Sequence, residues 1–205
     1  MHPETVSSAA DLSFLRSLAE AGRDAPLTAG PYLVAGGCWF GVASLLIGLH
    51  DMGFLALQTN VIVALMLGAT VGFAFTLYLL IRRDSRHVPN TANRVVGAAW
   101  SAAGFGIFAF FVAAAIVAAR SGNGFIMNSI ALAVLTLYGT AWQLTGAVTG
   151  QRWMTGVMVL TFASLLIVAA AVGTPYAWVA YAAALALSAV VPGLYLMRLA
   201  QAARA

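Results

Sequence analysis

The sequence predicts an all-α, polytopic membrane protein in which six transmembrane helices follow an N-terminal amphipathic interfacial helix. Of the 205 residues, 62% are hydrophobic and another 20 are glycine, whereas these residue types make up only about 45–50% of soluble domains. Charged residues make up 8% of the chain, and the mean hydropathy is +0.93. The charges also cluster and leave long uncharged runs. This pattern is typical of membrane-spanning chains, because a helix needs about 20 apolar residues to cross about 30 Å of hydrocarbon.

The spans follow from the uncharged runs. These runs lie between Asp24 and Asp51, Asp51 and Arg82, Arg94 and Arg120, Arg120 and Arg152, and Arg152 and Arg198. The last run is too long for one helix and divides at the turn residues 173–175, Gly-Thr-Pro. We therefore expect spans at about 31–49, 56–81, 95–119, 126–149, 153–172 and 177–197. Helices are expected because long segments without polar alternation must satisfy their backbone groups internally in lipid.

Residues 1–30 form a separate segment with four of the six acidic residues. Its polar start does not fit a secretory signal peptide. Residues 9–22 instead predict an amphipathic helix, with Leu12, Leu15 and Leu18 on one side and charged residues on the other. Two interpretations remain open. The helix lies on the inner leaflet of the membrane, or it docks a cytoplasmic partner.

The arginines predict the orientation of the chain. Nine of the ten precede the first span, follow the last span, or lie in the second and fourth connections. Basic residues near span ends stay in the cytoplasm, so we expect both termini, including the tail 199–205, to be cytoplasmic in a bacterial inner membrane. The candidate contacts with anionic inner-leaflet lipids or a partner are Arg82, Arg83, Arg86 and Arg94. This distribution explains the pI of about 9.7 without a nucleic-acid partner.

Small residues within the spans 31–198 predict close helix packing, because lipid supplies no hydrophobic force between helices. The candidate packing glycines are Gly37, Gly41, Gly68 and Gly72, and the third span adds Gly97, Ser101 and Gly104. The alternatives are the lining of a pore and self-association into a homo-oligomer.

The fourth span carries a polar stripe formed by Ser129, Thr136, Thr140 and Gln143. We expect this helix to lie centrally or to face a cavity, with a buried packing face as the alternative. Serine and threonine hydroxyls can bond to their own helix. The Gln143 amide, in contrast, needs a partner on another helix or in water.

Most catalytic and cofactor chemistry lacks candidate residues. The chain has no lysine for a Schiff base or phosphate-binding loop, no His-Glu-x-x-His helix and no Gly-x-Ser-x-Gly turn. No acidic or basic residue falls well inside a predicted span, and no two histidines share a helix face. His50 and Asp51 are interpreted as a solvated pair at the end of the first span. We therefore expect no enzyme activity, cofactor or metal site.

The layout of six short-looped spans with both termini inside resembles the small bacterial acid-resistance membrane proteins of the HdeD-like group. The amphipathic start at Asp11 to Arg16 is similar to that of small six-span proteobacterial inner-membrane proteins. The resemblance concerns layout alone and transfers no site residue. It implies an accessory, regulatory or partner-binding role without catalysis. The alternative function is a channel or carrier for a small neutral solute.

Overall fold

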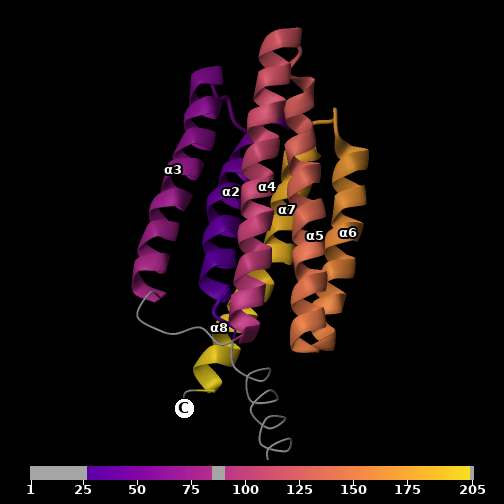
Figure 1. Ribbon diagram of the computed structural model, residues 1–205. Coiled ribbons are helices and arrows are strands. Elements are labelled where there is room, and N and C mark those ends of the chain that lie inside the picture. Colours follow the sequence, from indigo (N-terminus) through magenta and orange to yellow (C-terminus); the bar gives the residue numbers. More distant parts are fainter. Residues whose placement is uncertain (1–26, 85–90, 204–205) are drawn as a thin grey trace, which may run out of the picture.

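The computed structural model describes residues 27–84 and 91–203, and these residues form an all-helical bundle (Figure 1). Within this part of the chain, six helices are long and apolar enough to cross a membrane. The first five are α2 (Gly30–Asp51), α3 (Thr59–Asp84), α4 (Thr91–Ser121), α5 (Ser129–Thr149) and α6 (Arg152–Ala171), and a short 3-10 helix, η1 (Gly124–Asn128), precedes α5. The sixth consists of α7 (Ala177–Leu185), the π-helical segment η2 (Ala186–Val190) and α8 (Val191–Ala202).

The predicted all-helical fold with six span-length helices is confirmed, and the helix ends differ from the expected ones by a few residues. The turn that divides the last uncharged run is also present. Gly173 adopts a φ of +83°, a left-handed conformation that side chains disfavour, and the Thr174 hydroxyl donates a hydrogen bond to the Ala171 carbonyl. The expected amphipathic helix over residues 9–22 lies outside the described residues.

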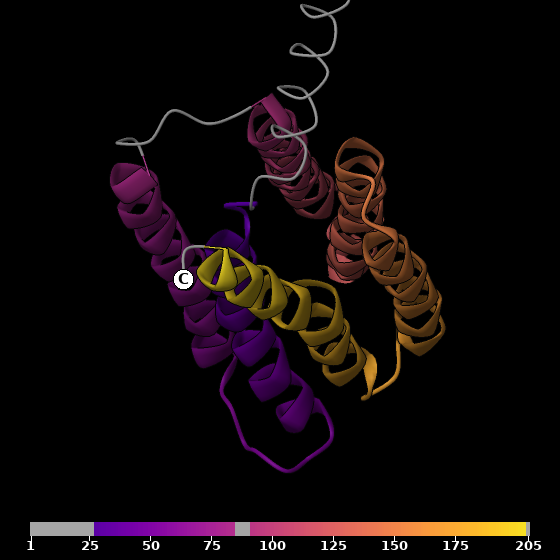
Figure 2. The same cartoon turned by 90° about the horizontal axis from the view of Figure 1, so that it is seen from below.

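The helices form an open row in which α2 lies next to the end helix α3. It packs against α3 on one side and against α7, η2 and α8 on the other. The row then continues through α6 and α5 to α4, so that α3 and α4 lie at its two ends (Figure 2). Helix α5, for which a central position or a face on a cavity was expected, is next to last in this row and packs against α6 and α4. Half of the most apolar stretch of the last span is buried.

Close packing of α2 depends on several glycines, and two of them are candidate packing glycines. A Cβ on Gly37 would lie 2.6 Å from the Val190 side chain in η2, and a Cβ on Gly72 would lie 2.6 Å from the Trp39 ring. The Trp39 indole also donates to the Thr76 hydroxyl, which in turn donates to the Gly72 carbonyl. Only a hydrogen atom at these positions allows the helices to approach so closely.

An aromatic row forms the centre of the bundle from α4 to α8. Neighbouring ring centroids lie 5.0 to 5.8 Å apart along Tyr138, Trp100, Trp142, Trp153 and Tyr195. The fully buried Trp142 donates its indole N–H to the Ser188 carbonyl at 2.8 Å. Pro192, four residues further on, has no N–H to offer that carbonyl. The indole of α5 thus supplies a donor that the last span lacks.

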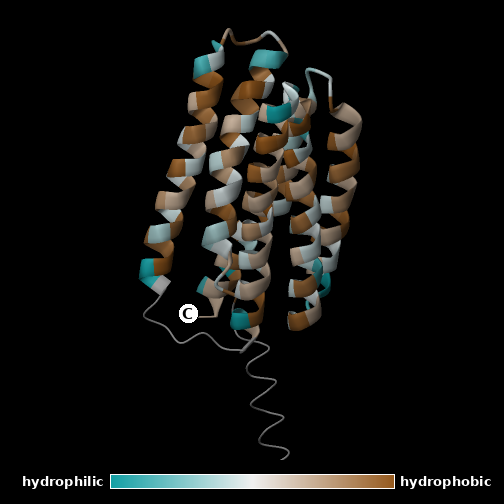
Figure 3. Ribbon diagram, turned by 45° about the horizontal axis from the view of Figure 1, so that its top comes forward, coloured by the Kyte–Doolittle hydropathy of each residue, from teal (hydrophilic) through white to brown (hydrophobic). Residues whose placement is uncertain are grey.

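The ends of the helices are more polar than the middle of the bundle (Figure 3). Hydrophilic residues gather near the helix ends, whereas hydrophobic residues dominate between them (Figure 3). The end of α3, the start of α4 and the C-terminal end of α8 lie at one end, and the α2–α3, α4–η1 and α6–α7 connections lie at the other (Figure 1). We call these the C-terminal end and the opposite end of the bundle.

Candidate functional site

The polar stripe of the fourth span lies on the outer face of the bundle. Thr136, Thr140 and Gln143 are exposed, and Ser129 is half-buried. Thr136, Thr140 and Gln143 therefore point away from the packed helices of this chain, contrary to expectation, whereas Ser129 lines a second cavity beside η1. The physical reason is the opposite side of α5, where larger side chains such as Leu135 and Trp142 fill the core.

The hydroxyls of this stripe are satisfied within their own helix. Thr136 donates to the Leu132 carbonyl at 2.8 Å, and Thr140 donates to the Thr136 carbonyl at 3.0 Å. Ser129 donates to the Ile126 carbonyl. Gln143 differs from them, because no residue that the structure describes bonds to its amide.

The centre of the bundle is filled by large side chains. Trp142, Leu135, Met154 and Leu185 are all less than 2% exposed. The buried hydroxyls of Thr145 and Ser188 donate to carbonyls of their own helices. Close packing of this kind leaves little room for a solute along the bundle axis.

The candidate lipid-contacting arginines surround one connection at the C-terminal end. Arg82 and Arg83 are exposed at the end of α3, and Arg94 is exposed in the first turns of α4. Arg86 lies outside the described residues.

The candidate packing glycines divide into two groups. Gly37 and Gly72 lie in tight contacts with η2 and α2, as described above. A Cβ on Gly41 or Gly68, in contrast, would meet no atom within 4 Å. The same holds for Gly97 and Gly104 of α4, which are exposed. An added Cβ would thus meet open space at all four positions, although Gly41 itself is buried.

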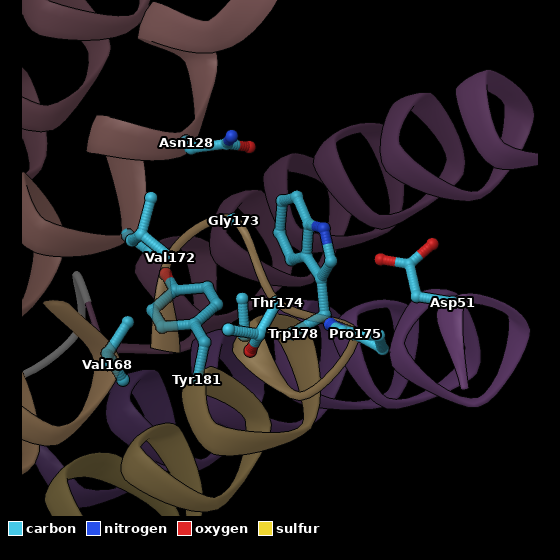
Figure 4. Close-up of a pocket in the computed structure, with 11 residues that line it drawn as sticks. Asp51, Asn128, Val168, Val172, Gly173, Thr174, Pro175, Trp178 and Tyr181 are labelled. Carbon is cyan, nitrogen blue, oxygen red and sulfur yellow. The ribbon is translucent and has the colours of Figure 1, made fainter. Parts of the chain in front are cut away.

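A cavity of about 360 Å³ opens at the opposite end of the bundle, where α2, α5, α6 and α7 meet (Figure 4). Its apolar wall includes Ala131, Val168, Val172 and Pro175. Its polar groups come from α2, η1 and α7 and line the same space, and they belong to Asp51, Asn128, Trp178 and Tyr181. Small-molecule sites combine apolar walls with a few convergent polar groups, and this cavity has both kinds of lining.

Two turns hold the rim of this cavity. His50 accepts a hydrogen bond from the Leu57 N–H through Nδ1, which also lies 3.0 Å from the Leu55 carbonyl oxygen. This contact closes the α2–α3 connection beside Asp51. On the other side, the Thr174 hydroxyl accepts from the Tyr176 N–H. The interpretation of His50 and Asp51 as a merely solvated pair is thus incomplete, because His50 shapes the turn and Asp51 lines the cavity.

This cavity was not among the features predicted from the sequence. Asp51, Asn128 and Trp178 lie far apart in the chain, and each one taken alone is an ordinary residue of a helix end. A usable signal was the position of all three next to predicted turns on the same side of the membrane. Among the described residues, no group of three or more His, Cys, Asp or Glu side chains could hold a metal ion.

Comparisons with protein-family models, curated proteins and solved structures give no match for this chain.

Proposed function

We propose that this chain is a non-enzymatic integral protein of a bacterial inner membrane that functions by association, and that a second copy of the chain packs against the outer face of α5. We define this outer face as Ser129, Thr136, Thr140 and Gln143. The carrying observation is the Gln143 amide, which is exposed and has no partner among the described residues.

The depth of Gln143 makes its exposure costly. It lies six residues before the end of α5 at Thr149, or about 9 Å along the helix axis. With the ends of α5 at the membrane surfaces, the amide lies within the hydrocarbon. An unpaired amide there lacks the hydrogen bonds that water would provide. Association with another polar group in the membrane removes this cost.

A second copy of the chain is a suitable partner for chemical reasons. A carboxamide has both donors and acceptors, so two Gln143 side chains can bond to each other across a two-fold axis. Two-fold interfaces bring the same residues of both subunits together. The threonines beside Gln143 keep their hydroxyls bonded to their own helix, so they present a compact face for helix packing.

The rival function, a channel or carrier for a small neutral solute, has less support. It requires a polar path through the bundle, whereas the axis is filled by Trp142, Leu135 and Met154. The polar stripe that suggested such a path points away from this axis.

The arginines supply the second element of the proposal. Arg82, Arg83 and Arg94 are exposed at the C-terminal end, where they would contact anionic lipid headgroups of the inner leaflet. Both termini are then cytoplasmic, and the α6–α7 turn faces outward.

Disulfide crosslinking in native membranes tests the interface. The single cysteine, Cys38, is first replaced by alanine, and one new cysteine is then introduced. Thr140→Cys lies on the outer face of α5, and Val159→Cys is a matched control on an exposed face of α6. We expect oxidation to give a covalent dimer with Thr140→Cys and little dimer with Val159→Cys. Equal crosslinking at both positions, or none at Thr140→Cys, would contradict the proposal.

The role of the amide is tested separately in the Thr140→Cys background. Gln143→Leu should weaken dimer association about threefold to thirtyfold and lower the crosslinked fraction accordingly, since hydrogen bonds between membrane helices contribute about 0.6–2 kcal/mol. Gln143→Asn keeps the carboxamide and should retain most of the dimer. A Gln143→Leu variant that crosslinks like the parent would show that the amide does not hold the interface.

A further inference from the structure

The cavity at the opposite end of the bundle contains polar groups that the chain itself leaves unused. The Tyr181 side chain is only 7% exposed, and its hydroxyl has no partner among the described residues. The same holds for the Trp178 indole N–H, the Asn128 amide and the Asp51 carboxylate, within residues 27–84 and 91–203. Figure 4 shows these four side chains around the same space. These groups line an open cavity, so a ligand that enters it can bond to them.

The sign of the charge at the cavity follows from Asp51. Helices α2 and α6 end at the cavity, whereas α5 and α7 begin there. Helix N-termini carry a partial positive charge and C-termini a partial negative one. The two helix ends and the two helix starts therefore make opposing contributions to the electrostatic potential in the cavity. Asp51 is the single formally charged residue among those that line the cavity. The site therefore favours a cation.

The wall of the cavity favours an organic ammonium ion over an inorganic cation. Trp178 and Tyr181 present aromatic rings whose centroids lie 6.3 Å apart at an interplanar angle of 67°. Aromatic faces attract ammonium groups, including quaternary ones that cannot donate hydrogen bonds. Val168, Val172 and Pro175 add apolar surface suited to alkyl substituents. An inorganic cation would instead require several oxygen ligands.

The geometry points to a binding site for a small organic ammonium ion. Its charge would lie between the Asp51 carboxylate and the Trp178 ring, and its alkyl groups would contact the apolar wall. The ammonium chemistry has two sources, a free solute or the headgroup of a membrane lipid. No basic side chain lines the cavity to receive a lipid phosphate, so we assign the site to the free ion.

Binding of choline to the full chain in phosphate-free maltoside detergent tests the proposal. The matched probe is 3,3-dimethylbutan-1-ol, which has the same shape without the charge. Isothermal titration should detect choline binding and give at least tenfold weaker binding for the neutral probe. A further titration in nanodiscs, with phosphatidylglycerol alone or with added phosphatidylethanolamine, separates the two sources. Weaker choline binding in the second lipid would show that headgroup ammonium occupies the site and would overturn the assignment to a free ion.

Substitutions at Asp51 and Trp178 test whether choline binds in this cavity. Asp51→Asn should weaken choline binding at least tenfold, and Asp51→Glu should restore part of it. Trp178→Phe should weaken binding, whereas Trp39→Phe, which changes an indole outside the cavity, should not. Size-exclusion chromatography shows whether each variant remains folded. Equal binding of both probes, unaffected by Asp51→Asn, would overturn the cation site, as would no binding of choline at 10 mM or below, a concentration on the order of weak small-molecule affinities.

Discussion

The Trp142 indole donates a hydrogen bond to the Ser188 carbonyl in the last span, where Pro192 lies close to the π-helical segment η2. Pro192 cannot donate to the Ser188 carbonyl, and the helix there widens into the π-helical segment η2. Such segments and prolines leave backbone groups that neighbouring side chains must satisfy. Trp142 does so from α5 while its ring fills the centre of the aromatic row.

Replacement of this residue should be costly. Trp142→Phe keeps an aromatic ring but removes the donor to Ser188, and we expect a loss of about 1–3 kcal/mol in the free energy of unfolding because a buried carbonyl is left unpaired. Trp39→Phe is the control, since its partner is a threonine hydroxyl near the surface. Reversible unfolding in mixed detergent measures both variants. An equal loss in the two would indicate that ring volume, rather than the hydrogen bond, explains the cost.

Helix α3 depends on a narrow contact with α2. Among the described elements, α2 is its main neighbour, and only 6% of its most apolar stretch is buried. Trp39 lies across Gly72 and donates to Thr76, four residues further along the same face. This arrangement combines close approach with a hydrogen bond between the helices.

Two glycines four residues apart on α3 provide a matched test. Gly72→Ala places a Cβ within 2.6 Å of the Trp39 ring, whereas a Cβ on Gly68 meets no atom within 4 Å. We expect Gly72→Ala to lower the thermal unfolding midpoint in detergent by several degrees, because displacement of the ring costs on the order of 1–3 kcal/mol. Gly68→Ala should leave the midpoint unchanged or raise it slightly, since alanine favours helix. If Gly68→Ala is the more damaging change, the packing of α3 differs from that described.

The two ends of the whole molecule differ in charge. Of the arginines within residues 27–84 and 91–203, Arg82, Arg83, Arg94, Arg152 and Arg198 belong to the C-terminal end, whereas Arg120 belongs to the opposite end. The asymmetry predicts that the C-terminal end is cytoplasmic. The cavity that contains Asp51 then opens toward the outer surface.

Labelling with a membrane-impermeant thiol reagent tests this orientation. In a Cys38→Ala background, Thr174→Cys lies in the exposed α6–α7 turn and Gln201→Cys lies near the end of α8. We expect Thr174→Cys to react in intact spheroplasts and Gln201→Cys to react only after permeabilisation. The reverse pattern would place the arginine-rich end outside and contradict the orientation.

The chemistry of the candidate site residues could be predicted from the sequence, but their directions and their convergence could not. The position of Gln143 within a span and its need for a partner followed from its chemistry alone. The direction of its side chain did not, because Ser129, Thr136 and Thr140 would form the same stripe on an inward or an outward face. Likewise, Asp51, Asn128 and Trp178 could each be placed near a turn, but their convergence depends on how α2, α5 and α7 meet.

The number, length and approximate ends of the helices depend on charge and apolar length, both of which the sequence contains directly. A charged residue is costly within hydrocarbon wherever the neighbouring helices lie, so the runs between Asp24 and Arg198 define the spans without tertiary information. The inward face of each helix is different. Lipid and protein accept an apolar side chain almost equally well, so the pattern of such residues hardly distinguishes the core from the membrane. Contacts between helices, such as Trp142 with Ser188 and Trp39 with Gly72, settle that choice, and they exist only once the bundle has assembled.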